Sequence, residues 1–167
     1  MRISDIFRFI LFLGIQLLIF DNIEIGGYIN PFFYVLFIFS LPFDIPLVFL
    51  LLASFAMGMS VDTFHHTYGM HAAASVFIAY IRSFVINFLL AGKEYDKGTI
   101  PGIENMGLGK YVSFVSILVL FHHFIYFFLE VFRFSNFFDT FFRIILSSIA
   151  TLIIIIIYQL IFSKEKK

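Results

Sequence analysis

The stretch GMSVDTFHHTYGMHAAASVFIAYIRSF, residues Gly58 to Phe84, concentrates polar side chains in a chain otherwise rich in phenylalanine, isoleucine and leucine. Gly58 and Asp62 are four residues apart, so they share one face of a helix, and Gly69 is placed to turn the chain. His71 and the three alanines after it open the next helix, and the alanines are small enough for close helix contact. We therefore predict a tight helical hairpin in which Asp62 caps the next helix or the free N–H groups of the turn.

The composition around this stretch indicates a protein solvated by lipid. Of the 167 residues, 61% are hydrophobic and 13% are charged, whereas soluble domains carry about 25% charged residues. The formal net charge is zero, so no basic field is available to attract nucleic acid. Cysteine is absent, which excludes disulfides and thiolate chemistry.

Apolar runs of transmembrane length recur along the chain. A helix needs about 20 apolar residues to cross a bilayer, and by this measure the candidate spans are residues 5–20, 28–41, 46–61, 71–91, 111–129 and 140–162. Pro31 opens the second span and LPFDIP closes it, so this span is expected to be short, and either tilted or only partly crossing. We predict an all-α integral membrane protein with about six transmembrane helices.

The basic residues predict the orientation of these spans. Lysine and arginine gather at the N-terminus, in the loop at 92–110 and in the C-terminal tail, which six crossings place on one side. The positive-inside rule then makes both termini cytoplasmic and leaves the hairpin turn outside. The loop at 92–110 lacks a G-x-x-x-x-G-K-[ST] phosphate motif and is expected to be a flexible connector.

Two arginines need an explanation, because a charge in a membrane span costs about 2.5–3.5 kcal/mol. Arg82 lies about halfway along its span. Three interpretations stay open for it: snorkelling to the surface, hydrogen bonding within the chain, or contact with a partner. Arg143 lies one turn inside the last span, where Glu130 or Asp139 is expected to pair with it.

The histidines do not form a metal-binding pattern. His65-His66 and His122-His123 are adjacent pairs, and neighbours on a helix point about 100° apart, so neither pair chelates a metal by itself. We expect no metal and no cofactor, and assign His122 and His123 to interhelical hydrogen bonds. The hairpin also brings a serine, a histidine and an aspartate together, but without a G-x-S-x-G elbow we expect no catalytic residues.

Three stretches, taken in order, resemble the rod-shape-determining protein MreD family as found in Bacteroidota-type bacteria. They are GMHAAASVFIAYIR at 69–82, preceded by the glycine four residues before an aspartate, INPFFYVLFIFSLPFDIP at 29–46, and GIENMGLGKYVSFVSILVLFHHFIYFFLE at 102–130. The resemblance covers nearly the whole chain. The turn FHHTY at 64–68 departs from it, because its residues are bulkier than the small ones often found there.

The resemblance implies a non-enzymatic scaffold in the bacterial inner (cytoplasmic) membrane, within the elongation machinery that builds lateral peptidoglycan. The implied partners are MreC, MreB, and a RodA-type glycosyltransferase with its class B transpeptidase. The family is also similar in fold to the substrate-binding components of energy-coupling-factor transporters. A vitamin-type substrate-binding component is therefore the alternative function, although the sequence has no cluster of outward Trp, Asn or Asp that would ring a vitamin.

Overall fold

The fold is all-α, with five helices long and apolar enough to cross a membrane among the described residues. The computed structural model describes residues 3–22, 29–91, 93, 95–131 and 137–162. The long helices are α1 (Ile3–Leu18), α3 (Leu47–His65), α4 (Met70–Leu89), α6 (Leu108–Val131) and α7 (Phe137–Phe162). Three shorter pieces accompany them: η1 (Phe20–Asn22), α2 (Val35–Phe39) and α5 (Ile103–Met106). The first stretch of membrane-spanning length, Ile3–Asn22, comprises α1 and η1. A multi-pass membrane protein fits this arrangement, as the composition predicts.

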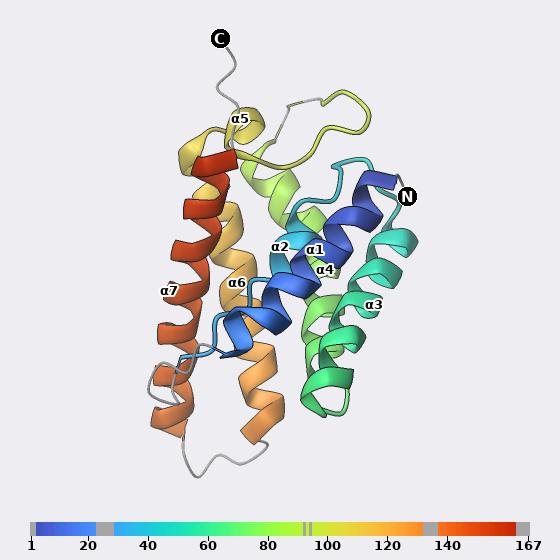
Figure 1. Ribbon diagram of the computed structural model, residues 1–167. Coiled ribbons are helices and arrows are strands. Elements are labelled where there is room, and N and C mark those ends of the chain that lie inside the picture. The colour runs from blue at the N-terminus through green and yellow to red at the C-terminus, as the bar shows by residue number, and fades with distance from the viewer. Residues whose placement is uncertain (1–2, 23–28, 92, 94, 132–136, 163–167) are drawn as a thin grey trace.

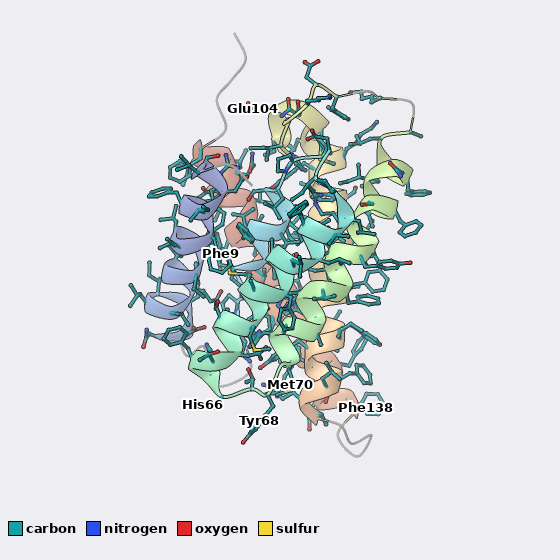
Figure 2. All side chains as sticks on the ribbon, turned by 90° about the vertical axis from the view of Figure 1, so that its right-hand side faces the viewer. Phe9, His66, Tyr68, Met70, Glu104 and Phe138 are labelled. Atoms are coloured by element: carbon teal, nitrogen blue, oxygen red, sulfur yellow. The ribbon has the colours of Figure 1, made fainter. Side chains whose placement is uncertain are left out.

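The long helices form a bundle whose two ends are distinct. α3, α4, α6 and α7 pack in chain order, each against the next, while α1 crosses obliquely against α3 and α2 (Figure 1). The N-terminal end of α1, the C-terminal end of α7 and the chain leading to α5 lie together at one end, which we call the terminal end. The turn between α3 and α4 lies at the other, the hairpin end; Figure 2 labels His66 and Tyr68 there and Glu104 at the terminal end.

The α3–α4 hairpin has the tight geometry that its glycines predict. His66 caps the C-terminus of α3 in a left-handed conformation with φ of 55°, and Gly69 follows with φ of 91° just before α4. At Gly58 a Cβ atom would lie 2.5 Å from the Cα of Ala72, so only glycine allows the two backbones to approach this closely. The polar stretch is thus an architectural joint between the two helices.

The segment at 28–41 differs from the spanning helix expected there. Only Val35–Phe39 is helical, and five residues are too few to cross a bilayer as a helix. The chain at 29–42, which we call the core segment, nevertheless passes through the bundle from beside α7 towards the terminal end (Figure 1). Just beyond it, the Phe43 N–H donates to the carbonyl of Thr99, in the chain leading to α5 at the terminal end, at 2.9 Å. The core segment therefore counts as a pass between the two ends of the bundle, and the chain keeps six passes, one of them largely unwound.

The unwound pass is enclosed by protein. Every residue from Pro31 to Phe39 is buried, and Tyr34, Val35 and Phe37 are each 0% exposed. Non-helical backbone at membrane depth is tolerated only where protein or water covers it, because lipid offers no hydrogen bonds. The core segment is accordingly the centre of the fold, and the long helices surround it.

Candidate functional site

Side chains of α7 satisfy the first N–H groups of the core segment. The Asn30 N–H donates to Ser147 Oγ at 3.0 Å, and the Phe32 N–H donates to Thr151 Oγ1 at 3.0 Å. Ser147 and Thr151 are one turn apart on α7, a spacing that matches alternate N–H groups of an extended chain. Two hydroxyls of one helix thus replace two backbone hydrogen bonds that the segment lacks.

Gln16 on α1 binds the same segment from the other side. Its Oε1 accepts a hydrogen bond from the Tyr34 N–H at 3.1 Å, and its Nε2 donates to the Pro31 carbonyl at 3.1 Å. The same nitrogen lies 2.7 Å from Asp21 Oδ1, which fixes the orientation of the amide. Gln16 is 1% exposed, so this polar residue of the first span is buried against the core segment rather than facing lipid.

Two arginines bind the carbonyls at the end of the core segment. Arg82 donates to the Leu41 carbonyl and, at 3.3 Å, to the Pro42 carbonyl, while Arg8 donates to the Ser40 carbonyl at 3.3 Å. Arg82 is 1% exposed, so the snorkelling interpretation is wrong and hydrogen bonding within the chain accounts for the residue. Its partners are backbone carbonyls, so these hydrogen bonds attach the end of the core segment to α4.

A tyrosine of the core segment links α4 to α6. The Tyr34 hydroxyl lies 3.0 Å from His71 Nδ1 and 2.7 Å from His122 Nε2, and all three side chains are buried. A phenol has one proton to donate, so it donates to one ring nitrogen and accepts from the other. His122 therefore has the interhelical role predicted for it, and Tyr34 supplies the connection.

His123 makes a second link, between α6 and α7. Its Nδ1 donates to the Val119 carbonyl at 2.9 Å within its own helix, which leaves Nε2 as an acceptor. The Thr151 hydroxyl lies 3.2 Å from that Nε2, so Thr151 can donate to His123 while it accepts from the core segment. The His123 ring also stacks on Phe32, with the ring centroids 4.9 Å apart.

Asp62 caps α4, as the hairpin pattern predicts. Its Oδ1 accepts from the His71 N–H at 3.0 Å and its Oδ2 accepts from the Ala72 N–H at 2.8 Å. The Thr67 hydroxyl of the turn also donates to Oδ1. The carboxylate thus satisfies donors at the start of α4 that have no partner within the helix.

Two side-chain pairs that each include a carboxylate tie the helices together at the hairpin end. Arg143 lies 3.1 Å from Glu130, which selects Glu130 over Asp139 as its partner, and its guanidinium sits 4.8 Å from the ring centroid of Phe127. This pair joins the end of α6 to the start of α7. His65 Nε2 lies 2.7 Å from Asp21, which joins the end of α3 to the end of the first pass.

The arrangement is a set of hydrogen bonds that hold an unwound segment. Among the described residues, no group of three or more histidine, cysteine, aspartate or glutamate side chains is placed to hold a metal ion. The interactions around the core segment use amides, hydroxyls, imidazoles and guanidinium groups. Their common effect is to position backbone and to connect α1, α4, α6 and α7 through it.

Sequence reasoning did not identify Gln16, Tyr34 and Thr151 as members of this set. Gln16 was visible as a polar residue in an apolar run, but its target could not be read from local spacing. Tyr34 and Thr151 lie in apolar stretches typical of membrane helices, so no local pattern marks them.

Comparison of the chain with protein-family models, curated proteins and solved structures finds no match.

Proposed function

We propose that the chain is a non-enzymatic scaffold of the MreD type, which binds other membrane proteins of the cell-elongation machinery. The proposal starts from the three stretches that resemble this family in order along the chain. Their positions in the structure support it: the hairpin stretch forms the α3–α4 joint, and the stretch at 29–46 contains the core segment. The stretch at 102–130 supplies α5 and α6, including both histidine links.

The filled interior is the observation that carries the proposal. The core segment places Phe32, Phe37 and Phe39 at the centre of the bundle, each 4% exposed or less. A component that captures a small molecule needs an open pocket, usually of about 300–1,000 Å³. Among the described residues, the centre of the bundle is occupied by these buried aromatic side chains, which favours a protein-binding role over ligand capture.

Two hollows of the described residues lie towards the terminal end. One, of about 220 Å³, is lined by Arg8, Gly102 and Gln159, and the other, of about 430 Å³, by Asp44, Asn87 and other residues. With the orientation predicted by the basic residues, this end is cytoplasmic. A transporter component would take its vitamin from the opposite side, so neither hollow supports that alternative.

In the proposed setting the protein lies in the bacterial inner membrane with both termini in the cytoplasm. Its partners are MreC, MreB, and a RodA-type glycosyltransferase with its class B transpeptidase. The rigid hydrogen-bonded core suits a scaffold, because a binding surface assembled from several helices keeps its shape only if their relative positions are fixed.

Copurification from membranes of the source cell tests this proposal. We expect a tagged chain to recover MreC and the RodA-type synthase pair, and depletion of the chain to reduce label incorporation into the lateral wall. Recovery of a pair of ATPases instead, with uptake of a vitamin lost on depletion, would contradict the scaffold and support the transporter component.

Reporter fusions test the proposed orientation separately. Fusions after Lys167 and within the loop at 92–110 should both report a cytoplasmic position, and a fusion after Thr67 an external one. Reporters at the loop and at Thr67 on the same side would overturn the six passes on which the orientation rests.

A further inference from the structure

One outward face of α4, a helix long and apolar enough to cross a membrane, carries polar side chains. Tyr80, Ser83 and Asn87 recur at helical spacing along α4, and all three are exposed. We call these three residues the α4 polar face. Figure 2 shows side chains of α4, drawn in light green, pointing away from the bundle. None of the three forms a side-chain hydrogen bond with any residue of the described chain.

Other outward hydroxyls of the long helices are satisfied by their own helix. Ser60 donates to the Ala56 carbonyl and Thr63 to the Met59 carbonyl, each at 2.8 Å. Such bonds let a hydroxyl face lipid at little cost. The α4 polar face lacks this arrangement. Acyl chains offer no hydrogen-bond partner, so any of its groups that faces the hydrocarbon core stays unsatisfied until another polar surface covers it.

The α4 polar face continues into the 430 Å³ hollow at the terminal end, which Asn87 also lines. Asp44, which also lines this hollow, accepts a hydrogen bond from the Gly98 N–H at 2.9 Å, and its side chain is exposed. Lys93 is exposed and pairs with no acid of the described chain. The Tyr95 hydroxyl is buried without a partner, and burial raises the pKa of this phenol above its usual 10.0, so it stays a donor.

We propose that this surface is a dimer interface that binds a second copy of the chain. Two copies inserted in the same direction meet about a two-fold axis along the membrane normal, so that like residues face like residues near the axis. Tyrosine, serine and asparagine each donate and accept hydrogen bonds and carry no charge, so the α4 polar face is complementary to itself. Away from the axis, Asp44 of each copy can pair with Lys93 of the other, so the two-fold axis generates two equivalent ion pairs.

The surroundings of the α4 polar face fit a protein partner better than a lipid. Phe84 and Phe88 flank it at 65% and 81% exposure and supply the apolar area that helix packing needs. A phospholipid could place its phosphate beside Lys93, but the carboxylate of Asp44 lines the same hollow and repels an anion. The second copy brings both charges in the required pairing.

Cysteine crosslinking in native membranes tests the dimer, and the absence of natural cysteine makes single-cysteine variants unambiguous. We expect Ser83→Cys and Asn87→Cys to form a disulfide-linked species of twice the 19.4 kDa mass when a membrane-permeable oxidant is added. The control is Val48→Cys on α3, which is 66% exposed to the same bilayer and should stay monomeric. Monomeric Ser83→Cys and Asn87→Cys, or equal crosslinking of Val48→Cys, would overturn the proposal.

A charge exchange tests the pairing independently of crosslinking. Asp44→Lys and Lys93→Asp should each weaken dimerisation about tenfold, measured by energy transfer between labelled copies in lipid vesicles, and the double variant should restore it. Circular dichroism identifies any variant that fails to fold. The Lys93 side chain forms no hydrogen bond or ion pair with a described residue, so Lys93→Asp remains informative if Asp44→Lys unfolds. Unchanged dimerisation in Lys93→Asp would contradict the proposed interface.

Discussion

Replacing Thr151 by valine tests the hydrogen bonds that hold the core segment. Valine keeps the shape of the side chain and opens no cavity, but it removes the acceptor of the Phe32 N–H and the donor to His123. A stranded buried N–H costs about 1–3 kcal/mol, and a hydrogen bond inside a membrane protein contributes about 0.6–1.7 kcal/mol. We therefore expect Thr151→Val to lower the free energy of unfolding by about 2 kcal/mol. The measurement is unfolding by SDS in mixed micelles, followed by far-ultraviolet circular dichroism because the chain has no tryptophan.

Two variants serve as controls for this measurement. Thr151→Ser keeps the hydroxyl and should lose only about 0.8 kcal/mol for the missing methyl group. Thr63→Val makes the same chemical change on the outward face of α3, where the hydroxyl bonds only to its own helix, and should shift stability by less than about 0.5 kcal/mol. If Thr151→Val is as stable as Thr63→Val, the hydroxyl does not support the core segment and the reasoning fails.

Substitutions at Gly58, Asp62 and Arg82 test other parts of the fold. Gly58→Ala should destabilise the protein by about 1–3 kcal/mol, because its Cβ meets the backbone of Ala72, whereas Gly14→Ala meets nothing within 4 Å and should be neutral or stabilising; equal unfolding midpoints would contradict the close contact. Asp62→Ala should cost about 1–2 kcal/mol and Asp62→Asn less, since the amide keeps one acceptor; the capping role fails if thermal melting separates neither from the wild type. Arg82→Leu should destabilise the protein purified in detergent by about 1–3 kcal/mol because two carbonyls lose their donor, and a more stable variant would mean that the cost of burying the charge dominates.

The parts of the fold set by local spacing could be predicted from the sequence. Gly58, Asp62 and Gly69 indicated the hairpin and its cap, because capping and turn chemistry act over a few residues. The link between Arg143 and Glu130 was one of two predicted pairs, since both acids are close to Arg143 in any packing of the last two helices. His122 and His123 were assigned to interhelical hydrogen bonds from their place in an apolar span.

The unwound pass could not be predicted in the same way. Residues 32–39 are apolar and aromatic, a composition that suits a membrane helix as well as a buried extended chain. What selects the non-helical backbone at residues 30–32 is the set of polar side chains on α1 and α7 that bind it. Phe32 and its acceptor Thr151 are more than 100 residues apart along the chain. The partners of Arg82 are backbone carbonyls, which every residue has, so no sequence pattern marks them.

Within the core segment, residues 30–32 are non-helical backbone held by side chains of α7 and α1, and the helix is confined to Val35–Phe39. Solid-state NMR of the ¹³C-labelled protein in lipid bilayers tests it directly, because Cα chemical shifts separate extended from helical backbone. We predict non-helical shifts at Asn30 and Phe32, helical shifts from Val35 to Phe39, and cross-peaks between Phe32 and Thr151. Uninterrupted helical shifts from residue 28 to residue 41, without contacts to Thr151, would contradict the account.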